Sequence, residues 1–219
     1  MAWSTNGIIW NAVRRFNFAV NFNINVVAYG NNRWIAGGNN GSIIVSDDNG
    51  VSWRRVATDV FGRSAINTIV FHNDRWLAGG TAGKMAYSDD NGLTWTVVQN
   101  STFGNSAINV IIYDDERWLA GGYGQSIAWS SDGITWRPIA RPFYILCMGF
   151  NGFRWIASGQ RGRMAWSGDG GDSWIVDEMS YSHFGENWIQ TVAFGRAPNG
   201  NIRWLSGGQN GKIIYADEQ

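Results

Sequence analysis

The stretch RWLAGGTAGKMAYSDDNGLTW, residues 75–95, decides the fold because it recurs with drift along almost the whole chain. Residues 75–78 and 84–87 are expected to form two strands joined by a glycine turn, and the polar turn after them leads to a third strand that begins at Thr94. One such unit cannot bury its apolar side chains alone, so neighbouring copies must pack on one another. The sequence therefore predicts a repeat protein.

An apolar strand precedes the quoted unit in each copy, so each copy has four strands. Trp76 and Trp118 occupy the same position in consecutive copies and are 42 residues apart. This period is typical of a β-propeller blade and not of a helical solenoid. We therefore expect a single all-β domain, a five-bladed β-propeller of four-stranded antiparallel blades. The predicted blades span about residues 16–60, 61–102, 103–142, 143–182 and 183–219, with residues 1–15 completing the last.

The N-terminal residues resemble the end of a blade whose first half is missing. Residues 183–219 supply three strands and no fourth, and residues 5–13 match the missing one. We therefore expect the N-terminal strand to close the last blade, which would leave no free sheet edge. Residues 2–4 and 215–217 both match the end of the same third strand, so one of these two segments must be displaced.

Composition restricts the classes of function. Charged residues make up 16% of the chain, and 17 basic residues balance 17 acidic ones, so the sequence lacks the charge of a nucleic-acid or anionic-membrane binder. No segment has the roughly twenty consecutive apolar residues of a membrane helix, and the first residues do not resemble an export signal. We expect a soluble protein, cytoplasmic or virion-associated. The single cysteine, Cys147, lies in an apolar run and is expected to be buried and unreactive.

The polar turns carry the most specific motif. Residues 46–53, 88–95 and 167–174 follow the pattern Ser-x-Asp-x-Gly-x-(Ser/Thr)-Trp, while residues 130–136 and 4–10 are shorter variants. This pattern is the Asp box, and the chain resembles the sialidase-type (BNR) repeat β-propellers over almost its whole length. In that family the box is a folding element found in enzymes, lectins and assembly factors alike, so the resemblance implies a fold and not an activity. The matched box residues are Asp48, Asp90, Asp132, Asp169, Asn6, Trp10, Trp53, Trp95, Trp136 and Trp174.

The chemistry of these turns favours a structural role. An Asp or Asn side chain accepts hydrogen bonds from nearby amides, glycine adopts a positive φ, and tryptophan buries a large ring. Calcium binding is the main alternative, but the turns lack the bidentate glutamate and the ligand count of a calcium loop. An arginine opens the second strand of each copy on the same edge, and we expect it to pair with box carboxylates or to stack on tryptophan. These arginines are Arg33, Arg75, Arg117, Arg154 and Arg203.

The sequence does not indicate an active site. Sialidases of the resembled family use an arginine triad, a Tyr/Glu pair and an acidic residue on a six-bladed ring, whereas five blades are expected here. Glycosidic cleavage needs two facing carboxyl groups, and the five predicted inner strands contain no Asp or Glu. His72 and His183 are expected on opposite faces, and no glycine-rich phosphate loop leads into a helix. We therefore expect no enzyme activity, no cofactor and no metal.

Recognition is expected on the face opposite the Asp boxes, where the copies differ most, because variable loops on a constant scaffold often bind ligands. Polar amides with a few aromatic rings suit a glycan, so we predict a non-enzymatic, lectin-like interaction scaffold. Two alternatives with a protein partner stay open: a structural component of a larger assembly such as a virion or tail, and an Asp-box assembly factor. Solvated loop residues without any ligand are the remaining interpretation. The predicted ligand-binding residues are Asn39, Asn40, Thr81, Tyr123, Gln125, Gln160, Arg161, Gln209, Asn210 and Trp188.

Overall fold

The computed structural model describes residues 1–13, 23–124, 127–139, 143–177, 183–198 and 200–218. These residues form four four-stranded sheets, one three-stranded sheet and one two-stranded hairpin, and every strand pair is antiparallel. Within each sheet, strands that follow one another in the chain lie side by side. The predicted all-β propeller of four-stranded antiparallel blades is therefore confirmed.

The four complete blades share one plan, a long first strand followed by shorter strands and ending in a fourth strand of two or three residues. The first blade has β3 (Ile24–Gly30), β4 (Arg33–Gly38), β5 (Ile43–Ser46) and β6 (Arg54–Arg55). The second has β7 (Ile66–His72), β8 (Arg75–Gly80), β9 (Met85–Ser88) and β10 (Thr96–Val97). The third has β11 (Ile108–Tyr113), β12 (Trp118–Gly122), β13 (Ile127–Ser130) and β14 (Arg137–Pro138). The fourth has β15 (Ile145–Phe150), β16 (Trp155–Gly159), β17 (Met164–Ser167) and β18 (Ile175–Asp177).

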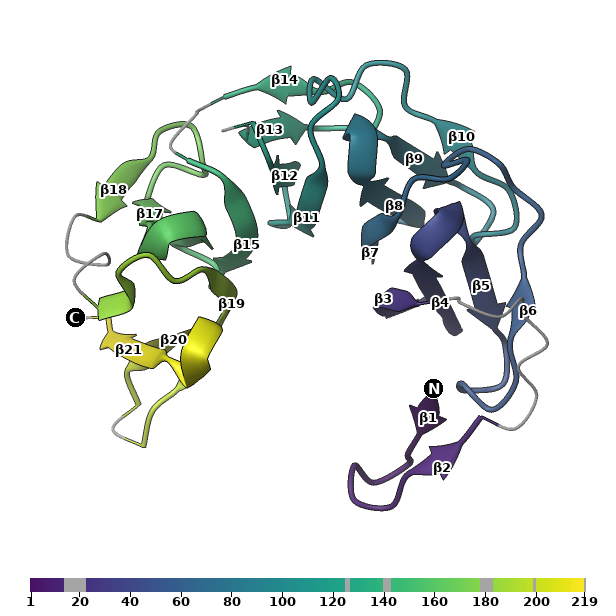
Figure 1. The fold of residues 1–219 in the computed structure, drawn as a ribbon, viewed down its shortest axis with the longest axis horizontal. Helices are drawn as coiled ribbons and strands as arrows, with labels where there is room; N and C mark the ends of the chain where they lie inside the picture. Colours follow the sequence, from purple (N-terminus) through teal and green to yellow (C-terminus); the bar gives the residue numbers. More distant parts are fainter. Residues whose placement is uncertain (14–22, 125–126, 140–142, 178–182, 199, 219) are drawn as a thin grey trace.

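The fifth blade and the N-terminal hairpin are incomplete. The fifth blade contains β19 (Ile189–Arg196), β20 (Ile202–Gly208) and β21 (Ile213–Asp217), and the hairpin contains β1 (Ala2–Trp3) and β2 (Asn11–Ala12). Figure 1 shows the blades following one another around an arc, with their first strands on the inside. The hairpin lies beside the first blade, and an opening separates it from the fifth.

The predicted closure of the last blade by the N-terminal strand is wrong for this structure. β2 pairs with β1, and β21 is an edge strand among the described residues. The physical reason is competition for one strand edge, because β1 already takes the edge of β2 that a closing blade would need. Of the two segments that match the same third strand, β21 occupies it and β1 stays in the hairpin. Five blades in one closed ring therefore stays a prediction.

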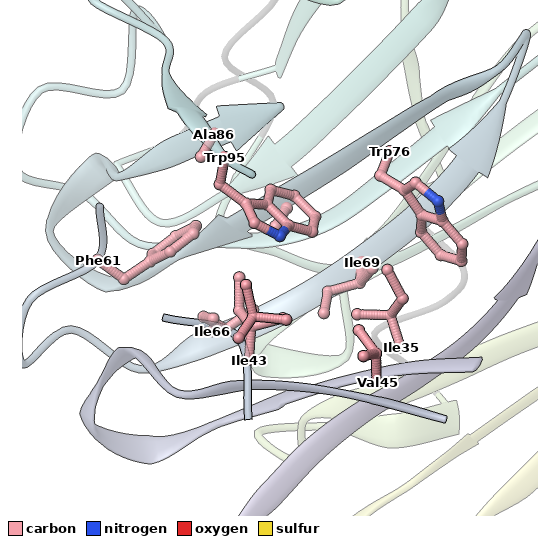
Figure 2. Close-up of a cluster of buried hydrophobic side chains, with 11 residues drawn as sticks. Ile35, Ile43, Val45, Phe61, Ile66, Ile69, Trp76, Ala86 and Trp95 are labelled. Atoms are coloured by element: carbon pink, nitrogen blue, oxygen red, sulfur yellow. The ribbon is translucent and has the colours of Figure 1, made fainter. Parts of the chain in front are cut away.

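The hydrophobic core is divided into clusters that lie between adjacent blades. Figure 2 shows the cluster between the first and second blades, where Ile35 and Ile43 meet Trp76 and Trp95. Ile35, Ile43 and Trp76 are fully buried, and Trp95 is 7% exposed. Each blade thus buries its apolar side chains against its neighbour, as the repeat pattern predicts.

The pair of glycines that ends the second strand is required by packing. A Cβ on Gly80 would lie 2.1 Å from the carbonyl oxygen of Ala65, and a Cβ on Gly79 would lie 2.7 Å from a methyl group of Ile108 in the next blade. Either contact is closer than real carbon atoms approach. Gly79 therefore permits the third blade to pack closely against the second. Gly80 permits the backbone of Ala65, just before β7, to pass close to the end of β8.

A one-turn 3₁₀ helix joins the second and third strands of four blades. In each of these turns the middle residue has a positive φ between 54° and 60°, a conformation that asparagine tolerates better than most residues. No helix in the part of the chain that the structure describes is long and apolar enough to cross a membrane. The four turns are η1 (Asn39–Gly41), η2 (Thr81–Gly83), η3 (Gln160–Gly162) and η4 (Gln209–Gly211).

Candidate functional site

The carboxylates of the polar turns between the third and fourth strands are satisfied within the turns themselves. Asp90 Oδ1 accepts hydrogen bonds from Ser88 Oγ (2.8 Å), Leu93 N (3.0 Å) and Thr94 N (2.8 Å). Asp90 Oδ2 accepts from Thr94 Oγ1 at 2.6 Å. These bonds fix the conformation of the turn. Comparable hydrogen bonds hold Asp48, Asp132, Asp169 and Asn6.

The same hydrogen bonds lower the pKa of the turn carboxyls. Burial raises the pKa of Asp132, but the amides of Thr135 and Ile134 outweigh it and bring the pKa to about 2. Hydrogen bonds from the hydroxyls of Ser52 and Ser173 lower the pKa of Asp48 and of Asp169, and those from Thr94 outweigh burial and lower the pKa of Asp90. Carboxyls that are already ionised have no proton to donate near neutral pH, so these turns are poorly suited to general acid catalysis.

The tryptophans that end the polar turns of the second, third and fourth blades pack against core clusters shared with the preceding blade. Trp95 donates its indole N–H to Gly92 O (3.3 Å) and packs among residues of the first blade, including Ile35 and Ile43. Trp53, Trp136 and Trp174 make the same hydrogen bond within their own turns. Trp10 differs, because its side chain is 62% exposed in the N-terminal hairpin.

The repeated arginines link the polar turns of neighbouring blades. Arg75 Nε lies 2.6 Å from Asp89 Oδ1 in its own blade, and Arg75 Nη1 donates to the carbonyl oxygen of Asp132 in the next blade. Arg33 and Arg117 also pair with turn carboxylates, whereas Arg203 pairs with Asp217 at the end of β21 and Arg154 lies 3.6 Å from Glu218. Arg33, Arg75 and Arg117 thus pair with carboxylates of the polar turns as expected, but their partners Asp47, Asp89 and Asp172 are not the matched box aspartates.

Asparagines at the start of the inner strands form a second link between blades. Asn25 donates to the carbonyl oxygen of Ile66 (3.1 Å), which begins the first strand of the next blade. Asn67 and Asn109 repeat this bond with Ile108 (3.0 Å) and Ile145 (2.7 Å). These amides hold the inner strands together.

On the opposite face, several predicted ligand-binding residues are engaged in closing the blade ends. Asn39 Oδ1 accepts from Asn25 (3.3 Å), and Thr81 Oγ1 accepts from the amide of Ala65 (2.9 Å). In the fifth blade, Gln209 Oε1 accepts from the backbone amide of Trp188 (3.0 Å). Asn210 donates to Asn187 Oδ1 at 2.6 Å, while Asn40 is exposed at the middle of its turn.

The structure brings two of the predicted residues together in a pocket. Gln160 and Arg161 line a space of about 280 Å³ with Phe143, Tyr144 and Arg163. Tyr123, also predicted, adjoins this pocket, since its ring centroid lies 5.6 Å from that of Tyr144. Gln125 lies outside the described residues. We refer to the space lined by Phe143, Tyr144, Gln160, Arg161 and Arg163 as the arginine pocket.

Sequence reasoning missed Tyr144 and Arg163. Tyr144 immediately precedes β15, in the apolar run that contains Cys147, and is 39% exposed. Arg163 immediately follows η3, and its exposed side chain lines the pocket beside Arg161. The only available signal was Arg161-Gly162-Arg163, which places two arginines in a turn where the other copies carry at most one cation.

A second cavity, also about 280 Å³, was not predicted. It lies between the fourth and fifth blades and has both apolar and charged walls. Glu218 at its edge accepts hydrogen bonds from Asn151 (2.9 Å) and the indole N–H of Trp204 (3.3 Å). We refer to this space as the last-blade cavity.

No group of three or more His, Cys, Asp or Glu residues in the described part of the chain is arranged to hold a metal ion. Cys147 is half-buried, and its Sγ lies 3.1 Å from Ser158 Oγ. Burial raises the pKa of this thiol to about 11, so only a small fraction is thiolate near neutral pH.

Comparison with known proteins identifies the fold class. No protein-family model matches the chain, and no curated protein matches its sequence. Among solved structures, YCF48 bound to D1 peptide is similar with a TM-score of 0.70 and 16% identity, over 97% of this chain and 70% of that one. The extracellular domain of the one component system BT4673 from B. thetaiotaomicron has a TM-score of 0.71 and 15% identity, over 94% of this chain and 28% of that one.

A third similar structure is an enzyme, the GH74 enzyme of Niastella koreensis. Its TM-score is 0.64 at 17% identity, and the match covers 90% of this chain and 30% of the enzyme. Because the three structures share only 15–17% of their residues with this chain, their similarity establishes the fold alone. The three matched structures are β-propeller proteins, and the present chain belongs to that fold class.

Proposed function

We propose that the protein is a non-enzymatic interaction scaffold that binds an acidic segment of a partner protein at the arginine pocket. The observation that carries this proposal is the convergence of Arg161 and Arg163 with Gln160 and Tyr144 around one open pocket. Guanidinium groups match carboxylates in shape and charge, and tyrosine supplies apolar contact area with a polar end.

The charge around the pocket supports an acidic ligand. None of the five lining residues is acidic, and Arg161 Nε forms an ion pair with Glu186 Oε2 at 3.4 Å. The side chains of Arg161 and Glu186 are 69% and 70% exposed, so their pairing contributes little and an incoming carboxylate can replace Glu186. The similar YCF48 structure is a complex with D1 peptide, and this peptide binding by a protein of the same fold supports a peptide ligand here.

Lectin-like glycan binding is the second candidate. The two neighbouring rings of Tyr123 and Tyr144, beside the amide of Gln160, favour it because aromatic faces and amides suit sugars. Roles as a structural component of a larger assembly, such as a virion or tail, or as an Asp-box assembly factor are compatible with the same pocket and would use a protein partner.

The direct test is binding of an immobilised library of acidic peptides, with matched peptides in which Gln and Asn replace Glu and Asp. We expect acidic peptides to bind, and the Arg161→Ala/Arg163→Ala double variant to lose that binding at least 10-fold. Arg55→Ala, which removes an exposed arginine on the outer strand β6, is the matched control and should bind like the unaltered protein. Glycan-array hits that free sugar competes, without peptide binding, would replace the proposal with the lectin-like one.

A further inference from the structure

The last-blade cavity occupies the place that a box tryptophan fills in the other blades. In the second blade, Trp95 packs with Ile35, Ile43 and Trp76 between two blades (Figure 2). The residues at the equivalent positions for the last two blades are Ile156, Met164 and Trp204, and all three line the last-blade cavity. The described part of the fifth blade has no fourth strand and no box tryptophan, so this space is empty.

Two further observations indicate that the cavity receives a strand. β21 is an edge strand, whereas each third strand of the complete blades pairs with a fourth strand. Ser206 lines the cavity, is 2% exposed, and its hydroxyl has no hydrogen-bond partner among the described residues. The other second strands carry alanine at this position, so Ser206 adds a buried polar group that an occupant of the cavity can satisfy.

The N-terminal hairpin carries the features that the fifth blade lacks. Trp10 occupies the box-tryptophan position, immediately before β2, just as Trp95 comes immediately before β10. Trp10 is 62% exposed, against 7% for Trp95. Asn11 pairs with Trp3 of β1 in the register that pairs Thr96 with Tyr87 of β9. Within the hairpin, β2 therefore corresponds to a fourth strand, and it pairs with the two residues of β1 where a fourth strand would pair with the third strand of a blade.

We propose that the last-blade cavity binds Trp10 of a second copy of this chain. In this association, β2 of one copy separates from its own β1 and pairs with β21 of the other copy, and Trp10 beside β2 enters the cavity. By the register of the complete blades, Asn11 then lies opposite Tyr215 and Ala12 opposite Ile214. The ladder lost between β1 and β2 is replaced by an equal ladder to β21, and burial of Trp10 is the net gain.

The arrangement of the two ends favours a second copy over the chain's own hairpin. The hairpin is docked on the first blade, where Trp3 Cβ lies 3.6 Å from the position of a Cβ on Gly50. The opening in Figure 1 separates the hairpin from the fifth blade, and the blades between the first and the fifth pack on one another in sequence. A second copy can approach without any change in this packing.

The end faces of the arc support the same association. On the fifth blade, Leu205 is 46% and Ile213 is 72% exposed, whereas the equivalent Leu77 and Met85 of the second blade are 0% and 1% exposed beneath the next blade. On the first blade, Val27 is 45% exposed, whereas the equivalent Ile69 is 5% exposed. The exposed face of the fifth blade and the exposed face of the first blade thus correspond to the two sides of the interface that adjacent blades form within the chain. Head-to-tail association covers both.

Disulfide trapping between separately tagged chains tests the proposal. One chain carries Asn11→Cys, the other carries Tyr215→Cys, and both carry Cys147→Ala to remove the native thiol. After mixing and mild oxidation, we expect a cross-linked heterodimer joined at positions 11 and 215. Adding Trp10→Ala to the first chain should reduce the cross-linked product at least 10-fold while the circular dichroism spectrum stays unchanged, because Trp10 is exposed in the separate chain.

A matched control replaces Asn11→Cys with Thr96→Cys. Thr96 occupies the equivalent position in a complete blade and already pairs with Tyr87, so no cross-link to position 215 is expected. A single chain with both Asn11→Cys and Tyr215→Cys identifies the source of the strand. An intramolecular disulfide in that chain at high dilution, without cross-linking between separate chains, would overturn the proposal, as would the absence of any cross-link in both experiments.

Discussion

Replacing Asp90 by alanine removes the acceptor that holds one polar turn together. The carboxylate of Asp90 accepts hydrogen bonds from the hydroxyl of Ser88, the amide of Leu93, and both the amide and hydroxyl of Thr94. Of these partners, Ser88 is 2% exposed, so water cannot readily replace its lost bond. The turn also positions Trp95 in the core between the first two blades. We therefore expect the change to destabilise the whole protein.

The magnitude follows from the number and kind of bonds. Hydrogen bonds to charged groups contribute about 1.5–3 kcal/mol each when buried, but Asp90 itself is exposed, so most of its bonds can be replaced by water. We expect Asp90→Ala to lower the free energy of unfolding by about 2–3 kcal/mol. Asp90→Asn should lower it by less than about 1 kcal/mol. The reason is Asn6, which already accepts amide hydrogen bonds from Ile8 and Ile9 at 2.9 Å in the N-terminal turn.

Urea unfolding followed by tryptophan fluorescence measures these differences. The matched control is Asp89→Ala, which removes the neighbouring carboxylate, itself 53% exposed, and its ion pair with Arg75. Surface ion pairs contribute about 0–1 kcal/mol, so this variant should unfold close to the unaltered protein. Equal losses for Asp90→Ala and Asp89→Ala would refute the structural role of the Asp90 hydrogen bonds.

Three further predictions concern pH, packing and thiol chemistry. The folded-state pKa of Asp132 is lowered to about 2, so the ionised carboxylate contributes fully to the free energy of unfolding above the unfolded-state pKa of about 4, and this contribution is lost as the pH falls towards 2. Acid unfolding of Asp132→Asn should therefore show a weaker loss of stability over that range than the unaltered protein. Gly80→Ala should lower the melting temperature by several degrees because its Cβ would meet the Ala65 oxygen, while Gly195→Ala, with no atom within 4 Å, should not. Cys147 should react with a thiol reagent far more slowly at pH 8 than after denaturation, because burial raises its pKa to about 11, and equal rates would contradict that assignment.

The fold could be predicted because the repeat is visible in the sequence. Trp76 and Trp118 mark the period, and the glycine pairs and polar turns mark the strand ends, each through a local physical requirement. Ring closure could not be predicted in the same way. The segments at 2–4 and 215–217 match the same strand, and pattern alone does not tell which segment β2 chooses as its partner.

The candidate site was only partly predictable. Gln160 and Arg161 were found because the turn they occupy differs from the other copies, and the structure places both in the arginine pocket. Tyr144 and Arg163 were missed because exposure of a residue beside a strand or turn depends on the neighbouring blade, which the sequence does not show. Asn39 and Thr81 were included as ligand-binding residues, but their side chains also bond within the scaffold, a use that polarity alone cannot distinguish from recognition.

The separation of roles between the two faces is tested most directly by measuring binding and stability on the same variants. Calorimetric titration of the tightest-binding acidic peptide, paired with thermal unfolding, should be run on Arg161→Ala/Arg163→Ala and on Arg75→Ala. We predict that the pocket variant loses at least 10-fold in affinity with an unchanged melting temperature, while Arg75→Ala melts earlier and binds normally. Loss of peptide binding in Arg75→Ala, with full binding by the folded pocket variant, would contradict the proposed function.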